Sequence, residues 1–209
     1  MAGGQQSSTV SLNARAGALA MLVSAPLNLV LHLHGQTLAP LSYLSWLGLT
    51  FGILCFCEEM GSGKPLNRGG LVLFAAAFWA NTTATFAADP AEIARAQVLY
   101  AFSTLGALVL WSVALMHRRE AARAMGQIGA AVGSGALVLL VAAHLLLGAS
   151  TIMGFSQLFS AFDQAGQGSL GNLVVIDAVL FAWCLAISLL LWTARIRASE
   201  TGTHALSQK

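Results

Sequence analysis

Six stretches of the chain are apolar over about twenty residues, the length that an α-helix needs to cross the hydrocarbon core of a bilayer. Only 9% of the 209 residues are charged, and 57% are hydrophobic. A soluble domain carries roughly 25% charged residues, so this chain lacks the charges to cover a surface exposed to water. We expect an all-α integral membrane bundle of six transmembrane helices, at about 14–34, 38–58, 69–88, 96–117, 126–150 and 172–194.

The basic residues fall almost entirely on one side of this predicted bundle. Alternate loops and both ends of the chain hold Arg15, Lys64, Arg68, Arg118, Arg119, Arg123, Arg195, Arg197 and Lys209, whereas the other loops hold Arg95 alone. Cytoplasmic loops are enriched in Lys and Arg. We therefore predict that both termini are cytoplasmic, with a polar tail at 1–13 and a second tail at 195–209, in the plasma (inner) membrane.

Several function classes are disfavoured by what the chain contains. The basic residues flank the apolar runs and form no patch for nucleic acid. The three cysteines, Cys55, Cys57 and Cys184, have no spacing typical of a disulfide framework or a redox motif. No nucleophile elbow, phosphate-binding glycine loop or zinc-protease motif is present. We expect a membrane protein that is not an enzyme and that has no metal or cofactor.

A stripe of polar residues interrupts the first apolar run. Ser24, Asn28 and His32 are four residues apart, so they lie on one face of a helix. Polar groups that face lipid are costly, and this face should therefore look toward the protein interior or a water-filled path. Pro26 within the stripe removes a backbone donor and is expected to bend the helix.

Polar groups on other spans are predicted at the same depth as this stripe. With the topology above and a rise of about 1.5 Å per residue, the outer half of the membrane holds His32, Asn28, Asn81, Thr82, His144 and Asp177. The preferred interpretation is the outer half of a permeation path for small solutes. Ser24, Asn28, Asn81, Thr82 and Trp183 would line it, Phe78 and Trp79 would narrow it, and His32, His144 or Asp177 would handle a proton.

Two other interpretations stay open. His32 or His34 could pair with His144 across helices as axial ligands of a b-type haem. Alternatively, the polar groups form only interhelical hydrogen bonds, and the chain is a structural subunit of a larger membrane complex.

Other features are predicted to be structural. The GxxxG pairs Gly48/Gly52 and Gly129/Gly133 favour helix packing within one chain, with a subunit interface as the alternative. Trp46 fits an interfacial position, while Trp79 and Trp183 are expected deep in the bundle. Residues 151–171 are expected to form an amphipathic outer helix or a plug over the outer mouth.

The order of several short motifs resembles the acetate uptake transporters, the family of the succinate–acetate permeases. Asn13-Ala-Arg-Ala-Gly-Ala-Leu19 stands where that family has Asn-Pro-Ala-Pro-Leu-Gly, without the two prolines. Glu58 or Glu59, followed by Asn67, resembles the end of the family's second span and the loop after it. Phe78-Trp79 and Ala182-Trp183 match parts of its third-span and sixth-span motifs. The resemblance implies a homo-oligomer, commonly a hexamer, whose protomers conduct small monocarboxylates such as acetate, with or without proton coupling.

Overall fold

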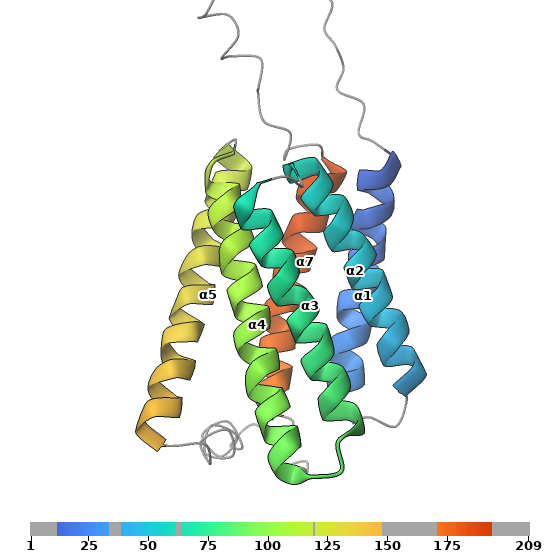
Figure 1. The fold of residues 1–209 in the computed structure, drawn as a ribbon. Coiled ribbons are helices and arrows are strands. Elements are labelled where there is room, and N and C mark those ends of the chain that lie inside the picture. Colours follow the sequence, from blue (N-terminus) through green and yellow to red (C-terminus); the bar gives the residue numbers. More distant parts are fainter. Residues whose placement is uncertain (1–11, 34–38, 62–63, 119, 148–170, 194–209) are drawn as a thin grey trace, which may run out of the picture.

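The computed structural model describes residues 12–33, 39–61, 64–118, 120–147 and 171–193 (Figure 1). These residues form helices and no strand. The helices are α1 (Leu12–Leu33), α2 (Ala39–Met60), α3 (Pro65–Phe86), α4 (Pro90–Met116), α5 (Glu120–Leu147) and α7 (Gly171–Trp192). All six are long and apolar enough to cross a membrane. The predicted all-α, six-span bundle is confirmed, and the protein is an integral membrane protein.

Helices α4 and α5 begin about six residues before the apolar pattern does, at Pro90 and Glu120. Asp89 caps α4, because its Oδ1 accepts a hydrogen bond of 3.0 Å from the backbone N–H of Ala91. Proline fits the first helical position, where its missing N–H costs nothing. These polar first turns are helical yet do not belong to the apolar run, so hydrophobicity alone places both starts too late.

Successive helices run in opposite directions (Figure 1). The first residues of α1, the last residues of α7, and the α2–α3 and α4–α5 connections lie at the same end of the bundle. Arg15 of α1 lies over the ring of Trp192 of α7 at 5.9 Å, which joins the two helix ends directly. The described basic residues at this end are Arg15, Lys64, Arg68, Arg118 and Arg123, and Arg95 is near the other end. The excess of positive charge predicts that this end faces the cytoplasm; we call it the cytoplasmic end and the opposite one the outer end.

The helices fall into two groups by the extent of their contacts. Helix α1 packs along α2 and α7, while α4 packs along α3 and α5. Contacts between the groups are smaller and are made mainly by α4 with α7, with further contributions from α2 with α3 and α5 with α7. Helix α7 thus sits between α1 and α4 (Figure 1). We refer below to the α1–α2–α7 group and the α3–α4–α5 group.

The GxxxG pairs pack helices together inside one chain, as predicted. A Cβ on Gly48 would collide with the side chain of Ser24, and one on Gly52 would lie 2.8 Å from the carbonyl oxygen of Gly17. Gly129 in α5 is similarly close to Ser112 in α4. Small residues at these points let the helix backbones approach closely.

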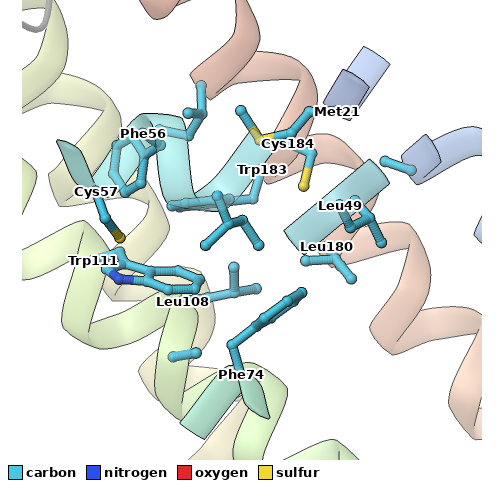
Figure 2. Packing of buried hydrophobic residues seen from close by; sticks show 14 of the residues in the cluster. Met21, Leu49, Phe56, Cys57, Phe74, Leu108, Trp111, Leu180, Trp183 and Cys184 are labelled. Carbon is cyan, nitrogen blue, oxygen red and sulfur yellow. The ribbon is translucent and has the colours of Figure 1, made fainter. Parts of the chain in front are cut away.

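Aromatic side chains fill the bundle interior, from Trp46 in the outer half of α2 to Phe56 and Trp111 near the cytoplasmic helix ends. We call Trp46, Phe56, Phe74, Trp111 and Trp183 the aromatic column; they come from α2, α3, α4 and α7. Trp111 stacks on Trp183 with ring centroids 5.4 Å apart, and Phe56 meets Trp183 edge-on at 5.3 Å. Trp46 packs on Phe74 at 5.2 Å. Figure 2 shows most of this packing, with Phe56, Phe74, Trp111 and Trp183 labelled.

Two tryptophan predictions are wrong. Trp46 was expected at the membrane interface but is 1% exposed, and Trp79 was expected inside the bundle but is 70% exposed. The reason lies in α3, whose buried face carries small residues, among them Gly70, Ala77 and Ala80. These let α4 approach closely, and Trp79, about 200° around the helix from Ala77, points outward.

Candidate functional site

A carboxyl group is enclosed in the outer half of the bundle. Asp177 on α7 is 2% exposed and is the only buried Asp, Glu, Lys or Arg among the described residues. Its Oδ1 accepts a hydrogen bond of 3.2 Å from Nδ2 of Asn28 on α1 and another from the hydroxyl of Tyr100 on α4. Ser45 on α2 donates to Oδ1 of Asn28 at 3.3 Å. We call these four residues the outer polar cluster.

The four residues meet because their helices bring them to a common depth. Asn28 stands five residues before the outer end of α1, and Ser45 and Asp177 each stand six residues after the outer start of their helices. At about 1.5 Å per residue, these positions are 7–9 Å below the outer helix ends. Tyr100 is ten residues into α4, the helix whose polar first turns extend it outward. The predicted common depth of Asn28 and Asp177 corresponds to direct contact.

Hydrogen bonds in the cluster have a defined direction. The amide of Asn28 accepts from Ser45 through its oxygen and donates to Asp177 through its nitrogen. The hydroxyl of Ser45 is also 2.8 Å from the carbonyl of Ser42, so its single proton has two acceptors within reach. Because a buried polar group without a partner costs free energy, this mutual satisfaction is what makes the cluster tolerable in an apolar interior.

Tyr100 connects the two helix groups through this cluster. Asn28, Ser45 and Asp177 all belong to the α1–α2–α7 group, whereas Tyr100 belongs to the α3–α4–α5 group. A second polar link lies nearer the cytoplasm, where Nε1 of Trp183 donates to the hydroxyl of Ser112 at 3.2 Å. The predicted site residue Trp183 is thus part of the aromatic column, and its indole has the partner that burial requires.

Other predicted pore residues make different contacts. Ser24 is buried against Gly48 at the α1–α2 interface. Phe78 packs on Trp46 with centroids 5.6 Å apart, and the hydroxyl of Thr82 donates to the carbonyl of Phe78 at 2.9 Å within its own helix. Trp79 was predicted to narrow the path, but its side chain is exposed on the surface of the bundle and points away from the interior.

Asn81 lies at the depth of the outer polar cluster. It stands five residues before the outer end of α3 and is 5% exposed. Its neighbour Ala80 is buried as well. Asn81 therefore faces the bundle interior, as the sequence analysis expected.

The histidine predictions fall largely outside the described side chains. His32 lies on α1 one turn beyond Asn28, and His144 lies near the outer end of α5, but the structure describes the side chain of neither. His34 and nearly all of the predicted outer segment 151–171 lie outside the described residues. The haem interpretation therefore stays a prediction.

Three other residues that matched family motifs lie toward the cytoplasmic end. Asn13 is exposed on the first turn of α1, and Glu58 is exposed on the last turn of α2. Asn67 is buried, and its Nδ2 donates to the carbonyl of Gly61 at 2.7 Å. Gly61 has a φ of 88°, a conformation that favours glycine. Asn67 therefore stabilises the tight α2–α3 connection.

Sequence reasoning missed Ser45 and Tyr100. A serine in an apolar span is ordinary, and nothing in its immediate neighbours singles out Ser45. Tyr100 offered a stronger signal, because it is one of only two tyrosines and falls within a predicted span. A buried tyrosine hydroxyl usually finds a hydrogen-bond partner, and an intramembrane acid is the obvious one.

No protein-family model, curated protein or solved structure matches this chain.

Proposed function

We propose that the protein is a secondary transporter of small solutes in which Asp177 takes up and releases a proton. The observation that carries the proposal is the burial of this carboxyl and its hydrogen bonds to side chains from two other helices, Asn28 on α1 and Tyr100 on α4. An ionisable residue inside a membrane bundle is costly and is characteristic of a proton or ion pathway. A purely structural network needs only neutral amides and hydroxyls, so the carboxyl calls for another explanation.

Protonation of Asp177 would change the contact between the helix groups. An ionised carboxylate only accepts hydrogen bonds, whereas the protonated form has an O–H that must donate. The hydroxyl of Tyr100 and the amide of Asn28 both donate to Oδ1. A proton on this carboxyl weakens the bonds that hold α4 to α1 and α7. We propose that the two groups then separate and expose the cluster, as expected for alternating access.

Two features beside the cluster fit such a motion. Phe56, Trp111 and Trp183 of the aromatic column lie on the cytoplasmic side of the cluster, and their close ring contacts would block inward passage in this conformation. Pro26, two residues before Asn28, interrupts the hydrogen bonding of α1 and supplies a bending point. Bending of α1 at this point would move Asn28 away from Asp177.

The proposed solute is a small monocarboxylate, such as acetate, or its neutral acid. The amide of Asn28 and the hydroxyls of Ser45 and Tyr100 supply hydrogen-bond donors and acceptors that suit a carboxylate or a carboxylic acid. Resemblance to the acetate uptake transporters favours the same solutes. That resemblance also supports a homo-oligomer, a ring of commonly six protomers, in the plasma (inner) membrane.

Uptake of radiolabelled acetate into proteoliposomes tests the proposal. Neutral acetic acid crosses lipid unaided, so initial rates are compared with protein-free liposomes of the same composition. We expect a protein-dependent rate that rises when the side of addition is made more acidic. A rate equal to that of protein-free liposomes under every gradient would rule out acetate as the solute.

Two asparagines on α1 provide a matched pair of variants. Asn28→Leu removes the amide that binds Asp177, whereas Asn13→Leu changes an exposed side chain on the same helix. We expect uptake to fall about tenfold or more only for Asn28→Leu, which corresponds to about 1.4 kcal/mol. Equal uptake by both variants, each monodisperse in detergent, would show that the cluster is not on the path.

A further inference from the structure

A pocket of about 430 Å³ opens at the cytoplasmic end of the bundle, away from the outer polar cluster. It lies where the end of α2, the start of α3 and the end of α4 meet. Its lining consists of Met60, Lys64, Pro65, Leu66, Ala114, His117 and Arg118. The pocket thus combines four apolar residues with three basic ones, and none of the lining residues is acidic.

Arg118 is held by a contact that leaves donors for a ligand, whereas the single N–H of a neutral His117 is already used. Nη2 of Arg118 donates to the backbone carbonyl of Met60 at 2.5 Å. This bond satisfies a carbonyl in the last turn of α2 and fixes the guanidinium. A guanidinium has five N–H donors, so this bond uses only part of its capacity. Nδ1 of His117 is 3.0 Å from the carbonyl of Val113, which can only accept, so Nδ1 carries the proton.

Lys64 completes the basic lining of the pocket. It immediately precedes α3, is exposed, and makes no side-chain capping hydrogen bond. Its aliphatic stem passes close to Gly61, where an added Cβ would lie 3.5 Å from Cε. The stem of Lys64 therefore lies against the turn that Asn67 stabilises.

We propose that this pocket binds the phosphate group of an anionic ligand, supplied either by a phospholipid headgroup or by a soluble phosphate. Arg and Lys donors converging on one site are the usual partners of phosphate. The pocket lies at the cytoplasmic surface, where the leaflet is rich in anionic lipids and where basic pockets between helices bind headgroups. Met60, Pro65, Leu66 and Ala114 supply apolar surface beside the charges.

Calorimetric titration of the full-length protein in an uncharged detergent tests the site. One arm uses inorganic phosphate, and the other uses a short-chain phosphatidylglycerol. Saturable binding of the lipid alone identifies a headgroup site, and saturable binding of inorganic phosphate identifies a site for soluble phosphate. Each of these results supports the proposal. The absence of saturable binding in both arms overturns it.

Three variants show whether the binding occurs in this pocket. Lys64→Gln removes one exposed charge from the lining and is expected to weaken binding about tenfold. Lys64→Arg keeps the charge, and this variant is expected to bind as tightly as the parent. Arg123→Gln removes an equally exposed charge at the same end of the bundle but outside the pocket. Binding that is unchanged by Lys64→Gln, or weakened equally by Arg123→Gln, overturns the assignment to this pocket.

Discussion

The outer polar cluster and the aromatic column are both buried in the same bundle, yet different forces hold them together. The cluster depends on directional hydrogen bonds to one carboxyl, whereas the column depends on ring packing such as that of Trp111 on Trp183. Packing energy grows with the area in contact, and hydrogen-bond energy depends on the presence of each partner. Substitutions in the column should therefore change mainly stability, and substitutions in the cluster should change mainly transport and its response to protons.

The largest stability effect is expected in the aromatic column. Trp111 is fully buried and contacts Phe56, Phe74 and Trp183. Trp111→Ala removes these contacts and leaves a cavity, so we expect a loss of about 3–5 kcal/mol in unfolding free energy.

Trp79→Ala is the matched control, because Trp79 is 70% exposed on the outer surface. Unfolding of both variants in detergent, followed by circular dichroism, measures the difference. If Trp79→Ala were destabilised as much as Trp111→Ala, the packing described for the column would be wrong.

Tyr100→Phe is expected to have a smaller effect on stability and a larger effect on proton coupling. The substitution removes only the hydroxyl that donates to Asp177, the link between the two helix groups. We expect a loss of about 1–3 kcal/mol in unfolding free energy and a weaker dependence of uptake on the proton gradient.

Tyr43→Phe provides the control, since Tyr43 packs on Phe86 with ring centroids 6.1 Å apart and is not part of the cluster. Its uptake should respond to the gradient as the parent does. An unchanged gradient response in Tyr100→Phe would contradict the proposed role of the Tyr100–Asp177 bond.

The smallest effect is expected at the edge of the cluster. Ser45→Ala removes one hydrogen bond to Asn28, and the cost should be about 0.6 kcal/mol, the average for such bonds between transmembrane helices. Ser134→Ala on the exposed face of α5 is the comparison. Thermal unfolding measures the stability of the two variants. A lower stability of Ser134→Ala than of Ser45→Ala would contradict the description of the cluster.

Much of the fold could be predicted because its cause is local in the sequence. Runs of about twenty apolar residues predict each helix. The alternation of basic residues between loops predicts the direction in which each helix crosses the membrane. The start of α4 was missed by six residues because the capping of Ala91 by Asp89 involves polar residues. Such a first turn is helical for reasons unrelated to hydrophobicity.

The site was predictable only in part, because helix rotation and neighbour choice are set by packing. Depth alone brought Asn28 and Asp177 together correctly. Depth cannot tell which face of α3 is buried, so Trp79 was placed inside although small residues on the opposite face bring α4 close. The bond between Tyr100 and Asp177 requires α4 to pack beside α7, and no local pattern in the sequence specifies that contact.

Proton-driven uptake by an Asp177→Asn variant tests the central claim most directly. The substitution keeps the shape and an oxygen that can accept from Tyr100, but it cannot carry a proton. Glu92→Gln, an exposed acid in the first turn of α4, is the matched control. We predict that uptake by Asp177→Asn no longer responds to the proton gradient, while Glu92→Gln responds as the parent does. A full gradient response in folded Asp177→Asn would contradict the assignment of Asp177 as the proton-carrying group.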